Sequence, residues 1–109
     1  MKLIITVVQD KDAGRLLDAL VQAGLRATKL ASTGGFLKEG NTTLLVGVEE
    51  AKVDAVVGIV KRCCQAREQL VTPVTPVGGP AESFVPMPVE VMVGGATIFV
   101  VDVLRYEKV

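Results

Sequence analysis

The sequence predicts an α+β sandwich, in which two helices pack on one face of a β-sheet, and three observations lead to this expectation. Short runs rich in Ile and Val alternate with two longer stretches in which apolar residues recur at helical spacing. Glycine and proline fall between these runs, where the chain must turn. The length of 109 residues suits a single domain over residues 1–109.

The first third of the chain is expected to form strand, helix and strand. Residues 2–9 are rich in Ile and Val and predict a strand that is apolar on both faces. Asp10 or Asp12 is expected to cap the helix that follows, and Gly24 to end it. Residues 25–33 predict the second strand.

The middle of the chain is expected to repeat this pattern. Residues 41–48 predict a third strand, in which Leu44, Val46 and Val48 share one face. Glu49 then leads into a second helix, expected to run to about Arg67 with an apolar stripe along one side.

A long loop and two strands are expected to complete the chain. Residues 69–87 contain all but one of the five prolines, and we predict a loop there that is functional or partly mobile. Residues 88–93 and 97–104 predict the last strands, joined by Gly94-Gly95 as a hairpin turn. The order β-α-β-β-α-β, with an extra C-terminal strand, is that of a ferredoxin-like sandwich. Because several strands are apolar on both faces, we expect the chain to self-associate.

Composition excludes several classes of function. The charge balances at 12 basic and 12 acidic residues, so no field of one sign attracts duplex DNA or an anionic membrane. There is no histidine, and the adjacent Cys63 and Cys64 lie inside a helical pattern, so we expect buried thiols and no metal site. No run resembles a signal peptide or approaches the ~20 apolar residues of a membrane helix, and we expect a cytoplasmic protein.

Candidate ligand-binding residues gather around the second and third strands. Gly34-Gly35 precedes Phe36, so backbone N–H groups could approach an anion and the ring could stack on a base. Arg26 and Thr28 share a strand face and could bind a phosphate. Asn41 offers a donor and an acceptor to an adenine edge, and Gly47 leaves room for a flat base. Each residue alone also fits a plain turn, a solvated side chain or the core, so the residues by themselves indicate only an anionic planar ligand.

The chain resembles the PII-like cyclic di-AMP receptor proteins over nearly its whole length. The resemblance is carried by Arg26 to Leu37, which reads RATKLASTGGFL, and by GNTT at 40–43, REQLV at 67–71, PVEV at 88–91 and GGAT at 94–97. We regard TGGFL and GNTT at this spacing as a specific signal.

The resemblance implies a homotrimer of ferredoxin-like subunits that acts in signal transduction. It implies a short loop at 34–40, a longer loop at 69–87, and cyclic di-AMP bound in three clefts between subunits near these loops. The phosphates would meet Arg26, Thr28 and the backbone at Gly35, Phe36 and Leu37. The adenines would meet Asn41, Gly47 and Phe99. Glu107-Lys108-Val109 differs from the tails of other members, which affects the expected contacts but not the ligand class.

The expected protein is a receptor and not an enzyme, without a metal or a cofactor, and its downstream partner is not identified by the sequence. Alternatives are a PII-type sensor of ATP and 2-oxoglutarate, which the short turn at 34–40 disfavours, and a small ferredoxin-like enzyme. An enzyme would need an acid or base from Asp, Glu, Lys or Tyr106, and no paired carboxylates lie near the glycine turn. A third alternative is a structural trimer or a metal-tolerance protein of similar fold, and the lack of histidine weakens its metal version.

Overall fold

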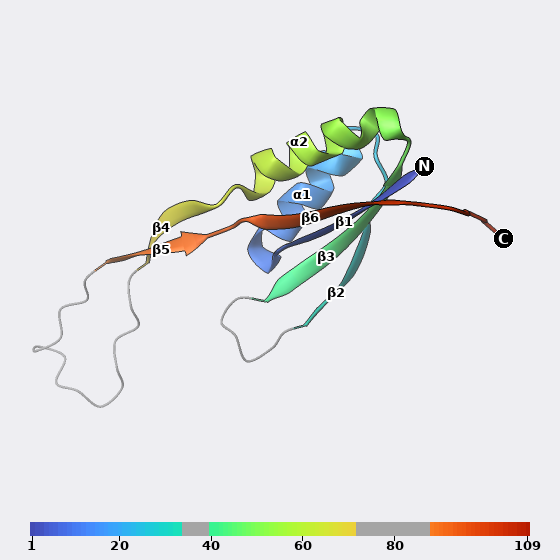
Figure 1. The fold of residues 1–109 in the computed structure, drawn as a ribbon. Helices are drawn as coiled ribbons and strands as arrows, with labels where there is room; N and C mark the ends of the chain where they lie inside the picture. The colour runs from blue at the N-terminus through green and yellow to red at the C-terminus, as the bar shows by residue number, and fades with distance from the viewer. Residues whose placement is uncertain (34–39, 72–87) are drawn as a thin grey trace, which may run out of the picture.

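The structure is a computed structural model that describes residues 1–33, 40–71 and 88–109 (Figure 1). Within these ranges a four-stranded antiparallel sheet has the order β2-β3-β1-β6. Its strands are β1 (Lys2–Gln9), β2 (Thr28–Thr33), β3 (Asn41–Val48) and β6 (Ala96–Asp102). Helix α1 (Asp10–Gln22) and helix α2 (Val53–Cys64), which follows the 3₁₀ turn η1 (Glu50–Lys52), cover one face of this sheet. The predicted ferredoxin-like sandwich is confirmed.

The core lies between the helices and the sheet. Every second residue of β1 and β3 is buried on the helix side, as the alternation of a half-covered strand requires. Ile4 and Leu44 are fully buried there against Leu16 of α1 and Val56 of α2. Each such side chain stabilises the fold by about 1.5–3 kcal/mol relative to an exposed one. The two cysteines at the end of α2 are buried and free, as predicted.

The opposite face of the sheet is apolar and open in the single chain. The strand register aligns Thr28, Leu45, Ile5 and Phe99 in one row across all four strands. Phe99 in this row is 52% exposed, and Val101 on the same strand face is 40% exposed. Large apolar side chains gathered on one face are typical of a surface that another molecule covers.

A separate two-stranded ribbon corrects the prediction for the middle of the chain. β4 (Arg67–Val71) pairs with β5 (Val89–Val93) and extends away from the helices (Figure 1). The second helix therefore ends at Cys64, because Gln65 already has an extended backbone, and the predicted boundaries at Arg67 and Gln69 are wrong. An extra strand was expected at the C-terminus. The additional pairing is instead this ribbon, which lies in the sequence between α2 and β6, the last strand of the main sheet. The rest of the expected loop at 69–87 lies outside the described residues.

Gly94 and Gly95 do not form the predicted hairpin turn. β5 pairs with β4, whereas β6 pairs with β1, so the two glycines join strands of different sheets. Both have positive φ angles, 82° and 93°, which L side chains rarely adopt. The predicted hairpin is therefore wrong, and the two glycines instead form the connection between the ribbon and the main sheet.

Of the two predictions for the ends of α1, the N-terminal one is wrong and the C-terminal one is confirmed. Gln9 occupies the N-cap position and no side chain caps the helix, so the predicted cap by Asp10 or Asp12 is wrong. The Asp10 carboxylate instead accepts a hydrogen bond from the Thr42 hydroxyl of β3. Gly24, with φ of 78°, ends the helix as predicted. β2 then begins at Thr28 and not at residue 25.

In the part of the chain that the structure describes, neither helix has the length and apolar character to cross a membrane.

Candidate functional site

A cavity of about 380 Å³ opens on the sheet face that the helices leave uncovered. It lies at the end of the sheet that holds the N-terminus. The start of β2, the end of β3 and the C-terminal segment meet there, and the cavity is lined by Met1, Leu3, Arg26, Thr28, Leu45, Gly47, Val103 and Tyr106. Three predicted ligand-binding residues, Arg26, Thr28 and Gly47, are thus brought together by the fold.

The polar side of this cavity can take an anion. Arg26 is exposed, and no ion pair joins it to another residue of the described ranges. The Thr28 side chain, exposed at the start of β2, adds a hydroxyl two residues away. A guanidinium beside a hydroxyl can donate charge-assisted and neutral hydrogen bonds to one phosphate.

The apolar side of the cavity has a gap at Gly47. Leu3 and Leu45 form the adjacent floor, and Leu3 is the direct cross-strand partner of Gly47. A Cβ built on Gly47 would have no atom within 4 Å, so the space above this backbone is open. A flat, apolar group could therefore rest on the strand here, where any side chain would stand in its way.

Asn41 lies at the other end of β3, in a different cavity. This second cavity, of about 310 Å³, is lined by Asn41, Gln9 and the segment from Gly94 to Thr97. Gln9 is the cross-strand partner of Asn41, and its side-chain oxygen accepts a hydrogen bond of 2.6 Å from the Gly94 backbone N–H. Asn41 is therefore placed next to the point where the ribbon joins the sheet.

One protomer does not gather all the predicted residues in one place. At about 3.3 Å per residue, the distance along β3 from Asn41 to Gly47 is roughly 20 Å. Phe99 lies between the two ends, in the row of Ile5 and Leu45. Gly35, Phe36 and Leu37 lie outside the described residues.

Sequence reasoning missed an ionic cluster around one buried carboxylate at the base of the ribbon. The Asp12 carboxylate is 1% exposed and lies 3.0 Å from Arg67 Nη2 and 3.1 Å from Arg15 Nη2. Arg15 Nη2 also donates to the Cys63 carbonyl at 2.5 Å. The hydrogen bond to Asp12 raises the pKa of Arg67. The spacing of Asp12 and Arg15 on α1 could have indicated their ion pair. The ion pair between Asp12 and Arg67 could not be expected while Arg67 was assigned to the second helix.

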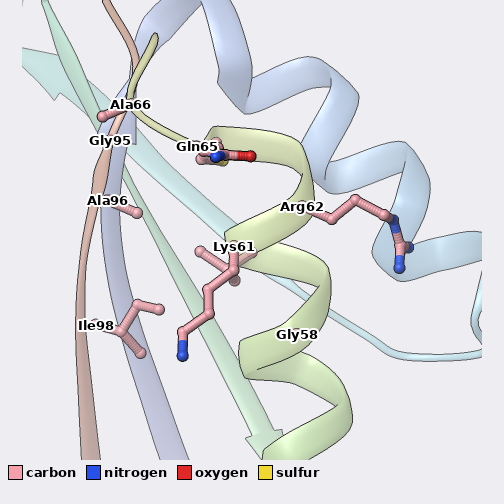
Figure 2. A pocket seen from close by; sticks show the side chains of 10 residues that line it. Gly58, Lys61, Arg62, Gln65, Ala66, Gly95, Ala96 and Ile98 are labelled. Atoms are coloured by element: carbon pink, nitrogen blue, oxygen red, sulfur yellow. The ribbon is translucent and has the colours of Figure 1, made fainter.

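A hollow of about 770 Å³, larger than the two cavities described above, lies elsewhere, between α2 and the edge strand β6 (Figure 2). Figure 2 shows Lys61 and Ile98 projecting into it, whereas Arg62 points away toward α1. None of the predicted ligand-binding residues lines this groove. Size alone therefore does not identify the functional site of this chain.

A metal centre was not expected, and the described residues contain no group of three or more His, Cys, Asp or Glu side chains that could hold a metal ion.

Comparison with known proteins identifies the family and supports the fold. A family model described as cyclic-di-AMP receptor matches residues 1–109, the whole chain. The crystal structure of a functionally unknown protein from Pediococcus pentosaceus ATCC 25745 is 42% identical and superposes with a TM-score of 0.76. That match covers 99% of this chain and 96% of the other.

Proposed function

Since the chain belongs to the cyclic-di-AMP receptor family, we propose that it is a cytoplasmic signalling receptor, and not an enzyme, that binds cyclic di-AMP in clefts between the subunits of a homotrimer. The observation that carries this proposal is the cavity at Arg26, Thr28 and Gly47. It places a cation and a hydroxyl beside an open apolar floor. A cyclic dinucleotide has phosphates for the polar side and flat bases for the floor.

The separation of the predicted residues supports clefts between subunits. Asn41 and Gly47 lie roughly 20 Å apart along one strand, so a ligand that meets both kinds of residue would draw them from different protomers. The open sheet face supplies the surface on which protomers would associate, because Phe99 and Val101 are large, apolar and exposed in the single chain.

The output of the receptor would pass through the ribbon. Asn41 lies beside Gln9, which holds the Gly94 backbone at the base of β5. A ligand that contacts Asn41 would thereby act next to the connection between β5 and β6. Binding would therefore act at Asn41 and Gln9, and a downstream partner would recognise the resulting change at the ribbon.

Calorimetric titration of the purified protein tests the ligand. We expect one cyclic di-AMP per chain, and much weaker binding of cyclic di-GMP and ATP. Guanine presents a carbonyl where adenine presents an amino group, so a site that hydrogen-bonds adenine leaves its own groups unpaired with guanine. Equal affinity for the two dinucleotides, or preference for ATP, would contradict the proposal.

Light scattering tests the assembly. The chain has a mass of 11.5 kDa, and we expect a particle of about three times that mass. Val101→Glu places a charge on the open sheet face, and its chain should remain folded while the trimer dissociates. A wild-type monomer at micromolar concentration would disprove the homotrimer and leave the ligand proposal to be judged by calorimetry.

A further inference from the structure

The C-terminal segment brings an aromatic ring to the cavity that holds Arg26, Thr28 and Gly47. Tyr106 lines this cavity together with Val103, and the residue is 65% exposed. The position was not among the predicted ligand-binding residues. We propose that Tyr106 forms the outer wall of the base site, so that one adenine lies between its ring and the strand floor at Gly47. This inference rests on the proposed function.

The segment is fixed to the sheet where the cavity begins. The Val103 backbone N–H donates to the Met1 carbonyl at 3.2 Å, which continues the pairing of β6 with β1 by one more contact. Arg105 and Glu107, on either side of Tyr106, form an ion pair of 3.0 Å. Both partners are exposed, so this pair adds little stability. The hydrogen bond at Val103 and the ion pair between Lys2 and Asp102 beside it join the start of the segment to β1.

The cavity has the size and the surfaces that a nucleobase requires. Its volume of about 380 Å³ falls within the range of about 300–1,000 Å³ that is usual for small-ligand sites. Leu3 and Leu45 offer an apolar floor, and the missing side chain at Gly47 lets a ring approach the backbone. An aromatic ring on the open side would cover the second face of the base by stacking.

A second copy of the chain could cover Tyr106 in place of a nucleobase. The neighbouring Arg26 argues against that alternative. Arg26 lines the same cavity without an ion pair to any residue that the structure describes. Covering an unpaired guanidinium with protein costs free energy unless a countercharge arrives with it. A dinucleotide brings that charge in its phosphates.

The composition of the chain allows a direct test. Tyr106 is its only tyrosine and it has no tryptophan, so tyrosine emission reports this residue alone. We expect cyclic di-AMP to quench that emission along the same binding curve that calorimetry gives. Free tyrosine amide titrated in parallel corrects for absorption by the ligand.

Variants complete the test. Tyr106→Ala should weaken binding roughly 5- to 150-fold, the effect of losing one base–aromatic stack, whereas Tyr106→Phe should retain the affinity. Leu104→Ala is the matched control, because Leu104 is 98% exposed in the same segment and absent from the cavity lining. Light scattering on each variant checks the assembly.

The outcomes separate this inference from the proposed function. Calorimetric binding with unchanged emission, or with wild-type affinity in Tyr106→Ala, would overturn the role of Tyr106 and leave the receptor intact. Loss of the assembly in Tyr106→Ala alone would make Tyr106 a subunit contact and also overturn it. Absence of any cyclic di-AMP binding to the wild type would instead refute the proposed function. If Tyr106→Ala does not fold, the wild-type emission still decides the question, because unchanged emission on binding would overturn the role of Tyr106.

Discussion

Arg67 and Asp12 join the ribbon to the sandwich, with Arg67 Nη2 3.0 Å from Asp12 Oδ1. Arg67 is the first residue of β4, and Asp12 lies in the first turn of α1. Arg67 Nη1 also donates to the Gln65 carbonyl at 3.1 Å. Gly94 packs directly against this pair, because a Cβ on Gly94 would lie 2.5 Å from Arg67 Nη1. The buried Asp12 carboxylate therefore anchors the base of the ribbon, and the absence of a side chain at Gly94 leaves the space that Arg67 occupies.

Gly94→Ala should destabilise the protein more than Gly95→Ala. Both glycines have positive φ, which costs an alanine about 1–2 kcal/mol. The alanine at Gly94 would in addition overlap Arg67 Nη1 and the Gln65 carbonyl, whereas the nearest atom at Gly95 is 3.9 Å away. With about 1–3 kcal/mol for overpacking, we expect a loss of about 2–5 kcal/mol at Gly94. Chemical denaturation of both variants measures this, and equal losses would disprove the close approach.

Arg26→Ala should weaken cyclic di-AMP binding by about 1.5–3 kcal/mol, the usual range for a hydrogen bond to a charged group. Lys29→Ala is the matched control. It removes the same charge from β2, but Lys29 does not line the cavity. Calorimetry on both variants separates a direct contact from a general effect of charge. If the two variants lose the same affinity, Arg26 has no specific role.

Gly47→Val should abolish binding and leave the fold intact. The new side chain would point into open space, since no atom lies within 4 Å of a Cβ at this position, and valine is favoured in strands. The same side chain would occupy the place proposed for the base. Circular dichroism and light scattering should match the wild type while calorimetry shows no binding. Binding close to the wild-type affinity would show that the base lies elsewhere.

Cys64 should make the stability depend on pH under alkaline conditions. Burial raises the pKa of this thiol from 9.0 to about 11, with the negative charge of Asp12 as the next cause. The unfolded chain therefore loses its proton at a lower pH than the folded chain. Stability should fall as the pH rises from about 9 towards about 11.

Denaturation at about pH 8 and about pH 10 measures this effect. Cys64→Ala removes the group, so its stability should fall less between the two values than that of the wild type. An equal fall in both proteins would show that Cys64 does not contribute.

The sequence predicted the sandwich well because its signals are local. The alternation of apolar residues in β3 set both the ends and the faces of that strand, and the structure has it at Asn41–Val48 as expected. Gly24 ends α1 as predicted, since a left-handed residue after an apolar helix is a local requirement. The position of Thr28 on the sheet face that holds Gly47 also follows from strand alternation and pairing, whereas Arg26 precedes β2 and reaches the same cavity from outside the strand.

Apart from the start of β2, the main errors concern partners that are distant in the sequence. β4 is short and polar, and only its pairing with β5 makes it a strand, so Arg67 was assigned to the helix before it. Asp12 was expected at a helix cap because its true partner, Arg67, lies 55 residues away. The position of Tyr106 depends on how the C-terminal segment crosses the sheet end, which no periodic pattern records.

The junction between the ribbon and the sheet also determines which side chains of β6 face the helices and which face the open side of the sheet. Side chains of a strand alternate between two faces, so Ile98 is directed toward the helices and Phe99 toward the open face. The segment from Val93 to Ala96 sets the phase of that alternation relative to the ribbon, because the Gly94 N–H donates to the Gln9 side chain and the Gly95 N–H donates to the Cys64 carbonyl. Adding or deleting one residue there would exchange the two faces of β6, burying Phe99 and exposing Ile98. The length of this junction therefore determines which side chains form the open face of the sheet as much as the choice of the residues themselves.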